Sequence, residues 1–136
     1  IKAVFTSEGL AAKVGDILDD TTLDDINEVG GVAINSVGDV AFHGQTGGVK
    51  AVFISSVGET PRVVAKVGDT LPGDTLIEDI EVSGGVAIND NGEVVFHGQA
   101  GSNRAVTDAV LVGLAPEETV DTEPTTFGYG ADMVGK

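Results

Sequence analysis

The chain has 136 residues, enough for one domain or two small packed units, and a formal net charge of −15. This acidity disfavours nucleic acid and anionic lipid as partners, because both are negatively charged. The absence of cysteine excludes disulfides, thiolate metal sites and cysteine nucleophiles.

Valine dominates the hydrophobic residues, which make up 41 % of the chain, whereas aromatic residues make up only 4 %. β-Branched side chains fit a pleated strand better than a helix. The 20 glycines lie at turn-like positions between short hydrophobic runs, which is typical of many short strands. No hydrophobic run approaches the roughly 20 residues of a membrane helix. The composition therefore predicts an all-β fold.

Four blocks of sequence occur twice, in the same order, which indicates an internal duplication. The pairs are Lys2-Ala3-Val4-Phe5 with Lys50-Ala51-Val52-Phe53, Ala12-Lys13-Val14-Gly15-Asp16 with Ala65-Lys66-Val67-Gly68-Asp69, Gly30-Gly31-Val32-Ala33-Ile34-Asn35 with Gly84-Gly85-Val86-Ala87-Ile88-Asn89, and Phe42-His43-Gly44-Gln45 with Phe96-His97-Gly98-Gln99. The first pair has the shortest spacing. We therefore expect a five-residue insertion near residues 58–61 of the second copy, where a hairpin loop can lengthen without disturbing strands.

In chain order, the second copy predicts strands over residues 50–55, 62–67, about 78–89 and 93–99. We expect Gly84-Gly85 to mark a bulge or bend in the third strand. Asn91-Gly92 predicts a tight hairpin between the last two strands. Residues 23–29 are the closest to a helical pattern, but their counterpart, residues 76–82, is richer in β-branched residues, so both are expected to be mainly extended.

A third copy of the opening strand follows the second repeat, at Asn103-Arg104-Ala105-Val106. This extra strand either completes the fold of its own chain or fills the edge of a neighbouring subunit. The expected organisation is repeat 1 over residues 1–49, repeat 2 over 50–103, the extra strand over 104–115 and an acidic extended arm over 116–136.

The repeats therefore predict two tandem four-stranded antiparallel units, packed as a sandwich-like, barrel-like or propeller-blade-like domain, with one strand available for exchange. Each unit has the size of a propeller blade, and two units are too few to close a propeller. The arrangements that remain are a sandwich or barrel of about eight strands and an open array completed by other chains.

The candidate catalytic residues are few. His43 and His97 occupy equivalent positions, each before Gly-Gln, and we interpret them as surface or capping residues rather than metal ligands. Ser7, His43 and Asp39 supply the residue types of a hydrolase triad, but no nucleophile elbow accompanies them. We expect no enzymatic activity.

Acidic clusters at Asp19-Asp20, Asp24-Asp25 and Glu78-Asp79 offer oxygen ligands of the kind that calcium prefers, although none forms an EF-hand loop. Residues 89–93 are interpreted as a turn rather than a calcium site, because the first copy lacks matching acids. No cofactor is expected, and bound calcium is left open.

Residues 30–42 and 84–96 share the phrase Gly-Gly-Val-Ala-Ile-Asn followed by Gly-Asp-Val-Ala-Phe or Gly-Glu-Val-Val-Phe. This phrase resembles a tandem repeat of secreted bacterial surface proteins, in which Ala-Ile-Asn-Asp-x-Gly-x-Val-Ala-Phe recurs about every 50 residues. The resemblance covers residues 2 to about 103 and implies an exported protein of propeller-like β architecture. More weakly, the chain is similar in architecture to subunits of extracellular filaments built by donor-strand exchange.

We therefore expect a structural subunit of an extracellular filament or surface array that polymerises with itself, without nucleic-acid partners or membrane insertion. A chain start at Ile1 fits either a mature exported protein or an expression fragment. The alternative is a monomeric secreted module that binds a glycan or surface ligand. The predicted subunit-interface residues are Ala3, Val4, Phe5, Ala105, Val106, Val110, Val112, Phe127 and Tyr129.

Overall fold

The computed structural model describes residues 1–71, 75–102 and 105–114, the last of these by backbone alone. Its described elements are strands and one short 3₁₀ turn, η1 (Val82–Gly84), so the all-β prediction is confirmed. The strands are β1 (Ala3–Thr6), β2 (Gly9–Lys13), β3 (Asp25–Ile26), β4 (Val32–Ile34), β5 (Val40–Thr46), β6 (Val49–Ser55), β7 (Arg62–Lys66), β8 (Thr70–Leu71), β9 (Thr75–Ile80), β10 (Val86–Ile88), β11 (Glu93–Ser102) and β12 (Ala105–Leu114).

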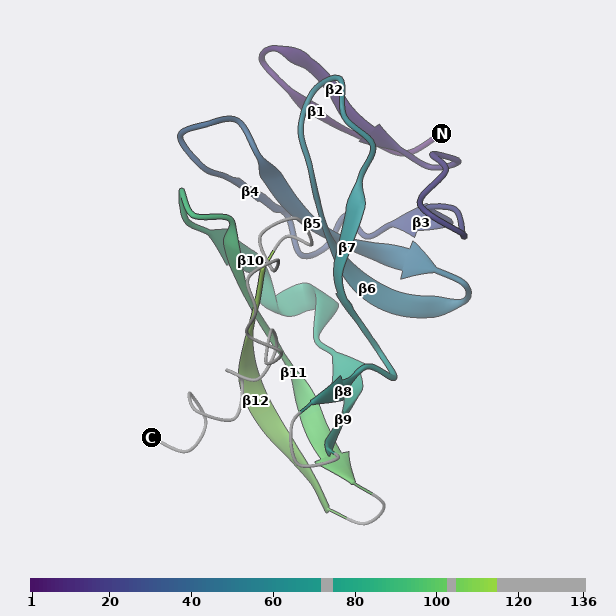
Figure 1. Ribbon diagram of the computed structural model, residues 1–136, viewed down its shortest axis with the longest axis vertical. Helices are drawn as coiled ribbons and strands as arrows, with labels where there is room; N and C mark the ends of the chain where they lie inside the picture. Colours follow the sequence, from purple (N-terminus) through teal and green to yellow (C-terminus); the bar gives the residue numbers. More distant parts are fainter. Residues whose placement is uncertain (72–74, 103–104, 115–136) are drawn as a thin grey trace.

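These strands form three antiparallel sheets that follow one another along the molecule (Figure 1). We call β1 and β2 the N-terminal hairpin. The middle sheet has the order β3-β5-β6-β7, with β4 also pairing with β5, and the C-terminal sheet has the order β10-β11-β9-β8, with β12 also pairing with β11. None of the three sheets closes into a barrel.

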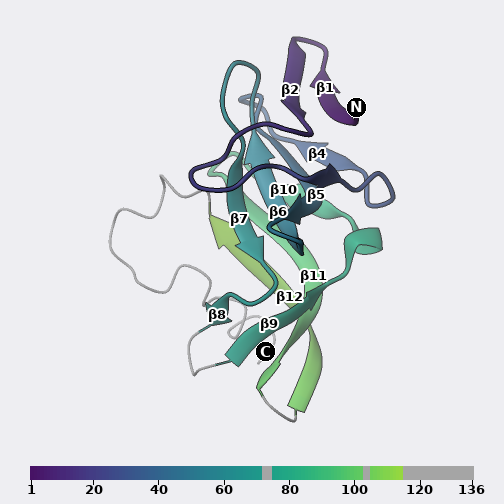
Figure 2. The same cartoon turned by 90° about the vertical axis from the view of Figure 1, so that its right-hand side faces the viewer.

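The sheets do not coincide with the sequence repeats. The last strand of repeat 1, β5, pairs with the first strand of repeat 2, β6, from Val40↔Ser55 to Thr46↔Val49. In the same way, β11 pairs with β12. Each large sheet therefore begins in one repeat and is continued by the opening strand of the next (Figure 2).

The predicted third strand of each repeat is interrupted. In repeat 2, β9 ends at Ile80, η1 follows, and Gly85 has a φ of 80° before β10 begins. Both β9 and β10 pair with β11, so one long partner serves two short strands. The bend expected at Gly84-Gly85 is confirmed, and it divides the strand expected over residues 78–89 into two pairing segments, β9 and β10.

The extra strand lies in its own chain's sheet, but its correspondence to the earlier opening strands differs from the prediction. Phe96 is opposite Leu111, as Phe42 is opposite Phe53. In cross-strand register, residues 108–113 are therefore the counterparts of residues 50–55. The sequence motif predicts a counterpart that begins four residues earlier, at Arg104. The error arises because the β11–β12 hairpin is longer than the β5–β6 hairpin.

Gly15-Asp16 and Gly68-Asp69 form two equivalent turns. Lys13 donates its backbone N–H and its ammonium to the Asp16 carboxylate, and Lys66 does the same with Asp69. The glycine before each aspartate has a φ near 100°, which favours glycine because it has no Cβ. These two turns end β2 and β7 at equivalent positions.

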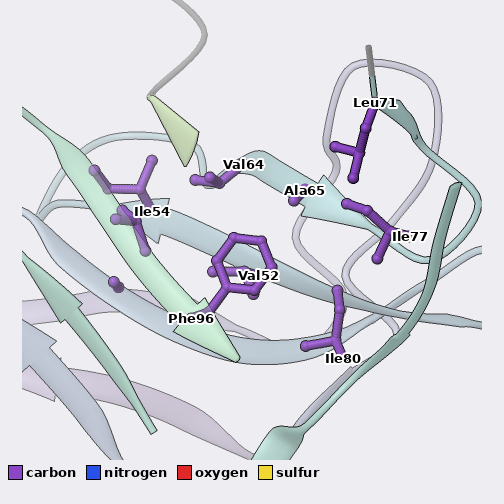
Figure 3. Close-up of a cluster of buried hydrophobic side chains, with 10 residues drawn as sticks. Val52, Ile54, Val64, Ala65, Leu71, Ile77, Ile80 and Phe96 are labelled. Carbon is purple, nitrogen blue, oxygen red and sulfur yellow. The ribbon is translucent and has the colours of Figure 1, made fainter. Parts of the chain in front are cut away.

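Two hydrophobic cores lie between the three sheets, one at each pair of successive sheets. The larger one, when partly buried members are included, lies between the middle and C-terminal sheets, where side chains of β6 and β7 face those of β8, β9 and β11 (Figure 3). Its buried members are Ala41, Val52, Ile54, Val64, Ala65, Leu71, Ile77, Ile80, Val94 and Phe96. Burial of such side chains stabilises a fold by about 1.5–3 kcal/mol each before entropy is counted.

The second core lies between the N-terminal hairpin and the opposite face of the middle sheet. Its buried members are Val4, Ala11, Ala12, Leu18, Leu23, Ile26, Val40, Phe42, Ala51 and Phe53. Most of them are the repeat counterparts of residues in the first core, such as Val40 and Val94. The same packing therefore occurs twice, once for each pair of successive sheets.

Candidate assembly interface

His43 is a core residue and does not lie on the surface, so the prediction of a surface or capping role is wrong for this residue. Its side chain is fully buried, and neither ring nitrogen has a hydrogen-bond partner among the described residues. Burial lowers the pKa of His43, since the charged imidazolium would lose its hydration. Its carbonyl accepts the N–H of Asn27, and His97 accepts that of Glu81.

The residue types of a catalytic triad are present, but they do not form one. The Asp39 carboxylate accepts a hydrogen bond from the Asn35 side chain at 3.2 Å, whereas His43 is enclosed in the core without a polar partner in the described part of the chain. Ser7 lies in the tight turn between β1 and β2. These positions give no support to acyl-transfer chemistry.

Two of the three acidic clusters supply a carboxylate to an ion pair. Lys2 pairs with Asp25 at 3.0 Å, and its repeat counterpart Lys50 pairs with Asp79 at 2.9 Å. The hydrogen bond from Lys2 lowers the pKa of Asp25. Within the described ranges, no group of three or more acidic, histidine or cysteine side chains is placed to hold a metal ion.

Residues 89–93 form the predicted turn. The Asn89 side-chain oxygen accepts the N–H groups of Asn91 and Glu93, so it is engaged within the turn. Asn35 does the same for Val37 and Asp39. This equivalence identifies both segments as hairpin turns closed by an asparagine side chain.

A surface pocket of about 480 Å³ lies beside β7. Its lining includes Leu18, Asp19, Asp20, Thr46, Arg62 and Lys66, and no aromatic side chain is among its lining residues. Sugar recognition commonly uses aromatic platforms. The pocket therefore gives no specific support to the glycan-binding alternative.

The most informative geometry is the junction between the repeats. Phe42 of β5 stacks on Phe53 of β6, with ring centroids 5.3 Å apart and an interplanar angle of 16°. Such a pair contributes about 0.5–1.5 kcal/mol beyond burial. Phe53 is fully buried, whereas its counterpart Phe5 is 70 % exposed. The difference follows from pairing, because β6 has β5 beside it, and the described residues place no strand on that edge of β1.

The predicted interface residues fall into three groups. Ala3 and Phe5 lie on the edge strand β1, but Val4 points into the second core and is 5 % exposed. The residues predicted at positions 105, 106, 110 and 112 lie on β12, whose backbone pairs with β11. Phe127 and Tyr129 lie outside the described residues.

Equivalent turns of the two repeats also touch each other. The N–H and hydroxyl groups of Ser36 donate to the two carboxylate oxygens of Asp90, at 2.8 and 2.6 Å, and the Asn35 amide donates to the Asn89 carbonyl at 3.0 Å. The side-chain and backbone hydrogen bonds from Ser36 lower the pKa of Asp90. The turn of repeat 1 supplies the donors and the turn of repeat 2 supplies the acceptors. The contact is therefore heterologous and has a direction along the chain of repeats.

Two residues that matter at this junction were not found by sequence reasoning. Val32 and Ile34 of β4 are 56 % and 57 % exposed, although both belong to a repeated block that reads as core. The duplication itself could have predicted this exposure, because a repeat at the end of an array lacks a neighbour to cover one of its faces.

The fold and the junction together define an all-β tandem-repeat protein whose successive sheets pack by one repeated arrangement. A family model described as a family of unknown function (DUF7453) matches residues 6–122, and the chain belongs to this family. Neither the curated proteins nor the solved structures give a significant match. In the described part of the chain, no helix has the length and apolar character needed to cross a membrane.

Proposed function

We propose that the chain is a non-enzymatic structural subunit of an extracellular filament or surface array, which assembles head to tail by β-strand complementation. The observation that carries the proposal is that the opening strand of one repeat pairs with the last strand of the preceding repeat, as in β5–β6 and β11–β12. By the same rule, we expect β1, the opening strand of repeat 1, to pair with the last strand of another copy. The extracellular location rests on the resemblance to secreted repeat proteins.

The register supports the N-terminal strand as the donor. If the β5–β6 register is repeated between subunits, β1 of one subunit lies along β11 of another, and Phe5 stacks on Phe96 as Phe53 stacks on Phe42. In the isolated chain, β12 occupies that edge of β11. Assembly is then an exchange, in which β1 of the incoming subunit replaces β12, and such a heterologous contact extends into a filament or closes into a ring.

Ala3→Pro tests the strand pairing. The N–H of Val14 donates to the carbonyl of Lys2, so the N–H of the next residue, Ala3, points to the opposite, open edge of β1. Proline removes this donor and leaves the hydrogen bonds of the hairpin in place. We expect Ala3→Pro to abolish filaments in negative-stain images and to leave a monomer by light scattering.

The matched control is Ala3→Gly, which keeps the N–H and adds no atom at a position whose counterpart, Ala51, is fully buried, so it should still form filaments. A chain that ends at residue 102, and therefore lacks β12, should assemble at a lower concentration because the edge of β11 is open. Filaments of normal abundance from Ala3→Pro would exclude β1 as the donor strand. A wild-type chain that remains monomeric at high concentration would exclude the proposed function.

A further inference from the structure

The outer face of β4 is exposed in repeat 1, whereas its counterpart in repeat 2 is covered. Val32 and Ile34 lie opposite Phe42 and Val40, and Val86 and Ile88 lie opposite Phe96 and Val94 in the same register. Val32 and Ile34 are more than half exposed, but Val86 and Ile88 are partly buried against the larger core. β10 is sheltered because β4 and β5 pack against it. Repeat 1 has no preceding repeat in the described chain to do this.

The complementary difference lies at the other end. Ala41 and His43 point from β5 toward the C-terminal sheet and are fully buried. Their counterparts on β11, Val95 and His97, are only partly buried. The far face of the C-terminal sheet is thus less covered than the equivalent face of the middle sheet.

A glycine marks where the two faces meet most closely. Gly30 lies so near the Val82 carbonyl oxygen of repeat 2 that an added Cβ would overlap it. The counterpart of Gly30 is Gly84. A Cβ there would make only ordinary contacts, 3.5 Å from the Cβ of His97 and 3.6 Å from Glu81. Both repeats have a glycine at this position. Within the described chain, only Gly30 of repeat 1 makes a contact that a larger residue would prevent.

We propose that these two faces bind each other in successive copies of this chain. The Val95–His97 face of one copy covers Val32 and Ile34 of the next, in the arrangement that already joins the middle and C-terminal sheets. Gly84 then abuts the backbone carbonyl of Glu28 in the next copy, as Gly30 abuts that of Val82. This inference rests on the proposed strand exchange and adds a face-to-face contact to it. The occupant is a second copy because, within the larger core, the equivalent face of β5 already packs against the β10 counterparts of Val32 and Ile34.

Gly84→Ala is the sharpest test. The isolated chain has room for the added methyl group, and Gly84 does not have a positive φ, so its melting temperature should stay close to that of the wild type. In the assembly, the methyl group meets the Glu28 carbonyl. We expect the critical concentration for assembly to rise by roughly tenfold or more, because the added methyl group would overlap a backbone carbonyl and overpack the contact.

Ile34→Asp tests the receiving face. A charge at this position cannot be buried without loss, so assembly should weaken while the monomer fold persists. Ile17→Asp is the matched control, because Ile17 is 72 % exposed and its repeat counterpart, Thr70, is exposed as well. We expect Ile17→Asp to assemble like the wild type.

The outcomes separate this inference from the proposed function. If the wild type forms filaments that Ala3→Pro abolishes, but Gly84→Ala and Ile34→Asp leave unchanged, the face contact is refuted and the strand exchange stands. If no filaments form, methyl NMR of the full chain decides. Concentration-dependent shifts of Val32, Ile34 and Val95 that Gly84→Ala removes would support the face contact alone, and their absence would overturn it. Contacts of Val32 or Ile34 with the chain's own C-terminal residues, independent of concentration, would also overturn it.

Discussion

At the scale of single residues, the two histidines show how one repeated position acquires two environments. His43 is enclosed between the middle sheet and the start of the C-terminal sheet, whereas His97 is partly exposed. The local sequence around them is the same, Phe-His-Gly-Gln. The difference comes from the sheet that follows. The C-terminal sheet covers His43, whereas no further sheet in the described chain covers His97.

The buried histidine predicts a loss of stability in mild acid. Burial lowers the pKa of His43 in the folded chain, so the unfolded chain binds more protons as the pH falls through about 6.5. The contribution of neutral His43 is complete above that value and declines below it. We expect the free energy of unfolding in urea to fall by up to about 1.4 kcal/mol per pH unit below pH 6.5.

His43→Leu should flatten this pH dependence between pH 7 and pH 5, because leucine has no proton to bind. The matched variant His97→Leu should keep the slope of the wild type. The same slope in wild type and His43→Leu would show that other groups cause the acid sensitivity. The carboxylates with a lowered pKa, Asp25 and Asp90, act at lower pH.

At the scale of elements, the hairpin turns show how two sequences produce one geometry. In each turn, a glycine N–H donates to the asparagine carbonyl three residues earlier, and the glycine, Gly38 or Gly92, has a positive φ. These features are typical of a type I turn followed by a glycine bulge. Repeat 2 has Asn91 before the glycine, whereas repeat 1 has Val37, which is 67 % exposed.

Val37→Asn should therefore stabilise the chain. Asparagine suits the third position of such a turn, and a β-branched residue does not. We expect the free energy of unfolding to rise by about 0.5 kcal/mol, measured by urea denaturation. The reverse change, Asn91→Val, should lower it by a similar amount. A decrease with Val37→Asn would show that the exposed valine makes a favourable contact in the turn.

At the scale of the whole molecule, the net charge opposes the proposed assembly. Each copy carries a formal net charge of −15, so copies of the chain repel each other and screening by salt should help the proposed subunits to associate. Raising the NaCl concentration from about 0.02 M to about 0.3 M shortens the Debye length from about 20 Å to about 6 Å. We expect the critical concentration for assembly to fall over this range, as measured by sedimentation. A rise would indicate that the contacts are mainly between opposite charges.

The same scale shows what sequence reasoning reached and what it missed. Duplication, strand content and turns followed from local patterns, because Asn-Gly, Gly-Asp and alternating valines act within a few residues. The correspondence of β12 was missed by four residues, since Ala105-Val106 and Ala109-Val110 both match the opening motif and only cross-strand register distinguishes them. The exposure of Val32 and Ile34 was missed because burial depends on a neighbouring sheet.

The sequence alone therefore determined that this protein is an acidic, all-β chain with two copies of one unit and an additional opening strand. Only the tertiary structure decided that each large sheet continues across a repeat boundary, that the additional strand pairs with β11, and that Phe5, Val32 and Ile34 remain exposed. The physical reason is that a repeated sequence specifies the same strand in each copy, whereas its burial and pairing depend on which neighbours it has.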